Sequence, residues 1–282
     1  MSQLLTSVIQ SLQGVYPPSE ARAVARLLLE EGPFDLSVSQ LFAGKDSDLS
    51  ESQQTLLQNY IQRLQSGEPI QYVLGHAWFC GLKLKVGPGV LIPRPETEDL
   101  VQWIVDDWKD CKEPRILDAC TGSGCIAVAL AHKISNVQIE AVDASPEALA
   151  YARENALPYW QQVHPCLGDV LEPGGKNLPH LQVIVSNPPY IAQEEAVDMT
   201  VQVKDFEPYM ALFVSDDDPL IFYRALARKG MRELLPGGAI YMEINQRFGQ
   251  EVCDLLRECG YQQVQLRNDR FGNPRMVKGV RG

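Results

Sequence analysis

The residues best suited to chemistry are Asn187, Pro188, Pro189 and Tyr190, which directly follow the apolar run 181–185. Consecutive prolines supply carbonyl acceptors without N–H donors, so the segment offers acceptors on a stiffened backbone. Asn187 adds a side-chain carbonyl, and Tyr190 adds a flat ring face. The combination suits a planar nitrogen held by its hydrogens, as in an amide or an exocyclic base amine. The alternative interpretation is a proline-stiffened turn after a strand.

A glycine-rich turn lies upstream. Residues 122–124 and Ala127 match the pattern G-x-G-x-x-A, and Asp143, about twenty residues later, is suited to accept bonds from ribose hydroxyls. Nicotinamide and flavin enzymes use this pattern, but an adenosyl cofactor would use the same parts. Asp118 precedes the turn and is better placed for a cationic amino-acid tail than for a pyrophosphate, or it caps a helix. Asp169 is a candidate for binding an adenine amine, or a surface-turn residue.

A repeated strand, turn and helix pattern must position these residues. Apolar runs predict strands at 115–118, 137–142, 163–167 and 181–185, with helices beginning near 126 and 146. This alternation predicts an open, mainly parallel sheet with helices on both faces. Ligands bind beyond the carboxyl ends of such strands, and Asp118, Asp143, Asp169 and Asn187 all fall there.

The chain after Tyr190 is expected to complete this sheet. Residues 192–218 are acidic and are interpreted as a loop that could serve as a lid. Beyond them we expect a helix over 219–235, a turn at 236–238, a strand over 239–244 and a helix ending near Cys259. The final segments, 261–266 and 275–280, are predicted to be two strands that pair antiparallel.

The N-terminal part has a different character. Leucine and valine recur at helical spacing from Leu4 to Leu12, and Ser50 with Gln53 forms a capping box before another helix. We therefore expect a helical domain over 1–75 that docks or packs, a β-hairpin linker over 76–90 with its turn at Gly81, and an α/β domain over 91–282.

Composition narrows the classes of partner and cofactor. The 282 residues carry a net charge of −11, which opposes broad binding to nucleic-acid phosphates. The apolar runs are too short to span a bilayer and the N-terminus lacks a signal pattern, so a cytoplasmic protein without membrane contact is expected. Seven scattered cysteines and four histidines show no ligand spacing, so we predict reduced thiols and no metal site.

The motifs also carry a family resemblance. Residues 118–124, Asp143 and 187–190 resemble the S-adenosylmethionine-dependent amino-methyltransferases, whose N-P-P-Y motif acts on planar NH2 groups. Residues 67–75 and 91–98 resemble the narrower HemK/PrmC family, the glutamine methyltransferases of peptide-chain release factors. Further similarity to that family lies in two short segments, Phe206-Glu207-Pro208 and Asn273-Pro274-Arg275.

The resemblance implies a Rossmann-like class I methyltransferase sheet with an antiparallel C-terminal strand, plus a small N-terminal helical domain for substrate docking, joined by the hairpin. It implies S-adenosylmethionine as the cofactor and S-adenosylhomocysteine as the product. The implied cofactor site is Cys120, Thr121, Gly122, Ser123, Gly124, Asp143, Asp169, Val170 and Asn187. The implied substrate site is Asn187, Pro188, Pro189 and Tyr190, of which Asn187, Pro188 and Tyr190 are catalytic. Cys120 departs from the pattern, which usually has a glycine there.

The implied reaction is in-line transfer of a methyl group to the side-chain amide nitrogen (N5) of the glutamine in a release factor's Gly-Gly-Gln motif. One rival, an adenine-N6 or guanine-N2 nucleic-acid methyltransferase, needs base extrusion and a basic path, which the acidic balance disfavours. A Rossmann dehydrogenase has no use for N-P-P-Y. An adenosyl-ligand sensor or a translation-associated binding module is the non-enzyme alternative.

Overall fold

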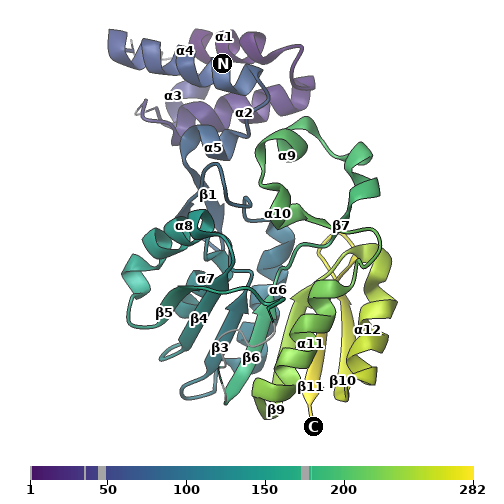
Figure 1. Ribbon diagram of the computed structural model, residues 1–282. Coiled ribbons are helices and arrows are strands. Elements are labelled where there is room, and N and C mark those ends of the chain that lie inside the picture. The colour runs from purple at the N-terminus through teal and green to yellow at the C-terminus, as the bar shows by residue number, and fades with distance from the viewer. Residues whose placement is uncertain (1, 35, 44–48, 173–177, 179) are drawn as a thin grey trace. The chain divides into compact units, whose positions relative to one another are not determined.

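The computed structural model describes residues 2–34, 36–43, 49–172, 178 and 180–282. The chain divides into two compact units (Figure 1). One unit comprises Met1–His76 with Thr200–Phe206, and the other comprises Ala77–Met199 with Glu207–Gly282. Over the described ranges, no helix is both long and apolar enough to cross a membrane.

The first unit is helical, as the spacing of its apolar residues predicts. Its helices are α1 Gln3–Leu12, α2 Pro18–Glu31, α3 Val38–Ala43, α4 Glu51–Gln65, α5 Ile70–Leu74 and α9 Val201–Phe206. The expected capping box is confirmed, because the Ser50 side chain accepts from the Gln53 backbone N–H while the Gln53 side chain accepts from Ser50 N. Leu12, Leu28 and Leu64 come from three helices and are fully buried in one core.

The second unit is built on a sheet. Among the described residues its strand order is β10-β11-β9-β6-β3-β4-β5. The strands are β3 Arg115–Ala119, β4 Gln138–Asp143, β5 Val163–Leu167, β6 Leu181–Ser186, β9 Leu234–Glu243, β10 Tyr261–Asn268 and β11 Pro274–Arg281. In the run β9-β6-β3-β4-β5 each strand is parallel to its neighbours, whereas β11 is antiparallel to both β9 and β10. The predicted α/β sheet with an antiparallel C-terminal strand is confirmed.

Helices cover both faces of this sheet (Figure 1). One face packs against α6 Pro95–Trp108, α7 Cys125–Lys133 and α8 Pro146–Ala156, and the other packs against α11 Ile221–Glu233 and α12 Gly249–Glu258.

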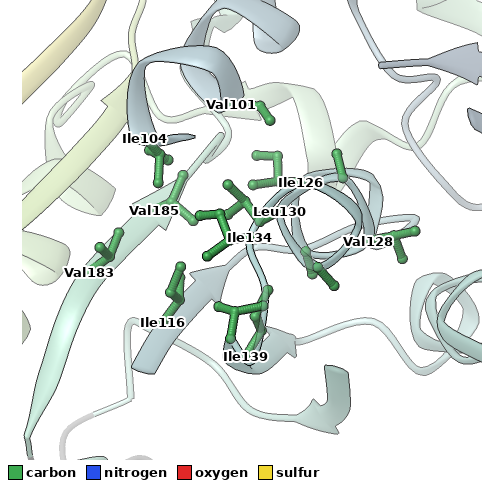
Figure 2. Close-up of a cluster of buried hydrophobic side chains, with 14 of the residues drawn as sticks. Val101, Ile104, Ile116, Ile126, Val128, Leu130, Ile134, Ile139, Val183 and Val185 are labelled. Atoms are coloured by element: carbon green, nitrogen blue, oxygen red, sulfur yellow. The ribbon is translucent and has the colours of Figure 1, made fainter. Parts of the chain in front are cut away.

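The alternation along β6 explains the two layers. Val183 and Val185 face one core while Ile184 faces the other, because successive side chains of a strand point to opposite faces. Figure 2 shows both valines with Ile104 of α6 and Ile126 of α7. Burying each such side chain contributes roughly 1.5–3 kcal/mol, so this central strand is firmly held.

The expected hairpin is also present. β1 His76–Phe79 pairs with β2 Leu82–Lys85, and the turn residues Cys80 and Gly81 have φ angles of 50° and 78°. Two positive φ angles are typical of the tight turn whose twist matches that of the flanking strands.

One expectation was wrong, and another was confirmed only in part. Residues 192–218, expected as loop, contain η2 Gln193–Asp198, the helices α9 and α10 Tyr209–Leu212, and strand β8 Phe213–Val214, which pairs with β7 Ile191–Ala192. These elements are too short for an apolar periodicity to reveal them. The turn expected at 236–238 is a bulge within β9. Leu234 pairs with Leu181 and Ala239 with Val183, so residues 235–238 stand opposite Gln182, and Gly237 has a φ of 81°. The remaining short elements are η1 Leu157–Tyr159 and η3 Gln246–Phe248.

Candidate functional site

A cavity of about 480 Å³ opens in the second unit at the carboxyl ends of β3, β4 and β6. The chain leaves β3 toward β4 and β5, then returns to β6 on the other side of β3. Such a reversal leaves a crevice beyond the strand ends, which is where open α/β sheets bind ligands.

Most of the predicted site residues meet at this cavity. Its lining includes Cys120, Thr121, Gly122, Ser123, Asp143, Asp169, Val170, Asn187 and Pro189. Gly124, Pro188 and Tyr190 lie outside the lining, and Pro188 is buried. The structure therefore brings together segments that follow four different strands.

The turn after β3 is tightly coiled. Gly122 and Gly124 have φ angles of 56° and 78°, in the left-handed region that favours glycine. A Cβ atom on Gly124 would lie 3.3 Å from the Cα and Cβ atoms of Ala152, so this glycine also allows α7 and α8 to pack closely. Cys120 has a φ of 58°, which explains why glycine is usual at its position. A cysteine in place of glycine at position 120 therefore introduces backbone strain.

Asp143 ends β4 and anchors the turn. Its Oδ2 accepts from the Gly122 backbone N–H at 2.8 Å and its Oδ1 from Ser145 N–H at 2.9 Å. Burial raises the pKa of the Asp143 carboxyl, and the backbone N–H donors oppose that rise. A carboxylate has about four acceptor sites, so Asp143 keeps acceptor capacity for a ligand hydroxyl.

Asp118 does not line the cavity, and its role toward a cationic tail stays a prediction. Its side chain is fully buried, and Oδ2 accepts from Thr121 Oγ1 at 2.6 Å and from Ala127 N–H at 3.1 Å. Ala127 lies in the first turn of α7, so the carboxylate accepts from one of the free N–H groups of that turn. Asp118 is not the N-cap residue, because Gly124 holds that position. Burial raises the pKa of Asp118 to about 7.

Asn187 belongs to a hydrogen-bonded chain of side chains. Its Nδ2 donates to Thr97 Oγ1 at 3.3 Å, and Thr97 Oγ1 donates to Glu243 Oε2 at 2.6 Å. The Tyr190 hydroxyl donates to the other oxygen of Glu243 at 2.9 Å. Both ends of the segment 187–190 are thus tied to one carboxylate at the end of β9.

Sequence reasoning missed Thr97 and Glu243. Glu243 is a polar residue at the carboxyl end of a predicted strand, which is the same signal that singled out Asp143. Thr97 lies in the segment 91–98 that carries the family resemblance, but its residue type gives no signal of this role, because a threonine in the first turn of a helix is common.

It also missed a tie between two segments that line the cavity. Glu207 is 5% exposed and forms an ion pair with Arg94 at 2.6 Å, while its other oxygen accepts from Ile92 N–H at 3.0 Å. Arg94 lines the cavity, and so do Tyr209 and Met210 of α10, just after Glu207. The carboxylate therefore fixes where α10 begins relative to the segment 91–94.

Among the described residues, no three His, Cys, Asp or Glu side chains form a group able to hold a metal ion.

Comparison with known proteins supplies the family. Residues 3–75 match the model of the PrmC N-terminal domain, and residues 97–204 match the methyltransferase small domain. The release factor glutamine methyltransferase of Bacteroides thetaiotaomicron is 42% identical over 100% of both chains. That of Flavobacterium psychrophilum is 36% identical over 97% of this chain and 96% of its own.

A solved structure supports the fold alone. The methyltransferase from Pyrococcus furiosus is 17% identical, covers 83% of this chain and 100% of its own, and superposes with a TM-score of 0.54. This likeness agrees with the predicted Rossmann-like methyltransferase sheet.

Proposed function

We propose that this chain, which belongs to the release factor glutamine methyltransferase family, methylates the side-chain amide nitrogen of the glutamine in a release factor's Gly-Gly-Gln motif. The observation that carries the proposal is the full-length 42% identity to a relative of that name. The site geometry supports it, since Asn187 lines the same cavity as the glycine turn and Asp143.

The residues present fit S-adenosylmethionine. Asp143 retains acceptor capacity for a ribose hydroxyl, and Asp169 with Val170 would flank the adenine. The turn Cys120 to Gly124 would face the amino-acid part with its backbone; a Cβ on Gly122 would meet only Val90, at 3.8 Å, so the turn leaves room beside it. The cavity volume of about 480 Å³ lies in the range of small-molecule sites.

The reaction would need positioning more than acid or base catalysis. The cofactor supplies a sulfonium methyl group: its carbon–sulfur bond breaks as a carbon–nitrogen bond forms, and S-adenosylhomocysteine and one proton leave. An amide nitrogen is a weak nucleophile because its lone pair is delocalised. Acceptors at Asn187 and Pro188 would hold the N–H groups, turn the lone pair toward the methyl group and stabilise the positive charge that develops on nitrogen.

The partner would be a protein rather than a nucleic acid. The helical unit matches the PrmC N-terminal domain, so we assign it the docking of the release factor. The net charge of −11 disfavours contact with a phosphate backbone. Because release factors act in translation, we expect the reaction to take place in the cytoplasm.

The test is incubation of the protein with labelled S-adenosylmethionine and a purified release factor. We expect label in the release factor, and none when the glutamine of its Gly-Gly-Gln motif is replaced by alanine. Label that persists after this replacement, or no transfer at all from a cofactor that binds, would contradict the proposal.

A further inference from the structure

Two buried residues support Asn187. Thr97 and Glu243 are each 1% exposed, and Thr97 also forms part of the cavity wall beside Asn187. They are 146 residues apart in sequence, yet the Thr97 hydroxyl donates to Glu243 Oε2 at 2.6 Å and accepts from Asn187 Nδ2 at 3.3 Å.

The polarity of this chain of hydrogen bonds is fixed at its buried end. A carboxylate has acceptors only, whereas a hydroxyl has a single proton. Glu243 therefore requires the Thr97 proton, and Thr97 can only accept from its other neighbour. That neighbour must be the NH2 group of Asn187, so the carbonyl oxygen of the amide is turned the other way. The two ends of an asparagine amide have nearly the same shape, so such a network is what decides its orientation.

We propose that Thr97 and Glu243 are positioning residues that hold Asn187 with its carbonyl oxygen, not its NH2 group, presented to the substrate. The inference rests on the proposed function, because the carbonyl oxygen of Asn187 is the acceptor that would bind the NH2 group of the substrate glutamine. The reversed amide would present a donor to a donor, and the glutamine nitrogen would then lose that hydrogen bond.

The geometry around Glu243 suits a carboxylate. Burial raises the pKa of Glu243, and the Thr97 and Tyr190 hydroxyls and the charge of Arg275 only partly offset that rise. Tyr190 donates to Oε1, so each oxygen receives one hydroxyl proton. Asn245, two residues beyond Glu243, donates to the Tyr190 carbonyl at 3.1 Å, so the end of β9 also holds the backbone of the segment.

The test compares Thr97→Val with Thr97→Ser. Valine keeps the shape but can neither accept from Asn187 nor donate to Glu243, whereas serine can do both. We expect kcat of Thr97→Val to fall about tenfold or more, because the alignment of Asn187 is lost. The cofactor Kd should stay within about twofold of the original, because valine keeps the shape of the cavity wall at this position. Thr97→Ser should recover kcat to within about threefold, a rescue that a merely structural role would not produce.

A matched control separates alignment from stability. Tyr261 also has a buried hydroxyl, which donates to the Ala227 carbonyl at 2.9 Å on α11. Tyr261→Phe should lower the melting temperature and leave kcat unchanged. Wild-type kcat in Thr97→Val, or a Thr97→Ser variant as slow as Thr97→Val, would overturn the inference.

A second variant keeps the inference falsifiable if Thr97→Val does not fold. In Glu243→Gln one acceptor oxygen replaces two, so the amide cannot accept from both hydroxyls. We expect kcat to fall about fivefold or more at an unchanged cofactor Kd, and an unchanged kcat would contradict the role of Glu243. An inactive wild-type protein would instead contradict the proposed function itself.

Discussion

The two halves of the cavity are held in place by hydrogen bonds that differ in the sequence separation of their partners. In the half built on the glycine turn, Asp118 bonds Thr121 and Ala127, and Asp143 bonds Gly122, over separations of 3, 9 and 21 residues. In the half built on the segment 187–190, the bonds from Asn187 to Thr97, from Thr97 to Glu243 and from Tyr190 to Glu243 span 90, 146 and 53 residues.

The difference suggests a division of roles. The turn half is a local structure that would recognise a cofactor by backbone approach and one carboxylate. The Asn187 half is assembled from distant segments and would orient a protein side chain. Substitutions in the first half should therefore change cofactor affinity, and substitutions in the second should change the rate of transfer.

The largest effect is expected from Asn187→Ala. Without the side-chain acceptor the glutamine nitrogen loses its orientation, so kcat should fall at least about a hundredfold. The measurement is single-turnover methyl transfer together with the cofactor Kd, which should change much less than the rate.

Asn268→Ala is the matched control, because Asn268 is exposed on β10 and does not line the cavity. It should behave as the wild type. Near-normal transfer by Asn187→Ala with bound cofactor would remove the role that we give to the Asn187 half.

The next effect is expected from Asp143→Ala in the turn half. The Gly122 N–H loses its partner and the ribose loses its acceptor, and a hydrogen bond to a charged group contributes about 1.5–3 kcal/mol. The cofactor Kd should rise about thirtyfold, measured by calorimetry, while kcat at saturating cofactor changes far less. Asp110→Ala removes an exposed carboxylate outside the cavity and should leave the Kd unchanged. A fall in kcat without a change in Kd would reverse the assignment of the two halves.

The smallest effect concerns Asp118 and pH. Burial raises the pKa of Asp118 to about 7, above its unfolded value of 3.8, so the folded state binds the proton more tightly. The resulting stability is complete below the unfolded pKa and is lost as the pH rises through 7. From about pH 6 to pH 8 this carboxyl should lower the free energy of unfolding by about 1 kcal/mol.

Asp118→Asn resembles the protonated form and still accepts from Thr121 and Ala127. Its free energy of unfolding, measured with denaturant at both pH values, should therefore decrease less toward pH 8 than that of the wild type. Burial also raises the pKa of Asp143, so part of the slope should remain. Identical slopes would show that Asp118 is not protonated in the folded state.

The difference in sequence separation between the contacts of the two halves also explains which features the sequence could predict. The ends of β3, β4 and β6 could be found because buried parallel strands are continuous apolar runs followed by a polar residue. That rule led to Asp143 and Asn187, but it could not tell that Asp118 points into the core, because direction depends on packing. Neither Thr97 nor the short helices within 192–218 carry a pattern of their own, since their places depend on contacts with remote segments.

The most direct test of the account is to locate the transferred methyl group. A release factor incubated with S-adenosylmethionine and this protein is digested, and its peptides are sequenced by tandem mass spectrometry. We predict one added methyl group on the side-chain amide nitrogen of the Gly-Gly-Gln glutamine, and none with Asn187→Ala. A methyl group on another side chain, or on the same glutamine at an unchanged rate with Asn187→Ala, would contradict the central claim that Asn187 directs an amide nitrogen to the cofactor.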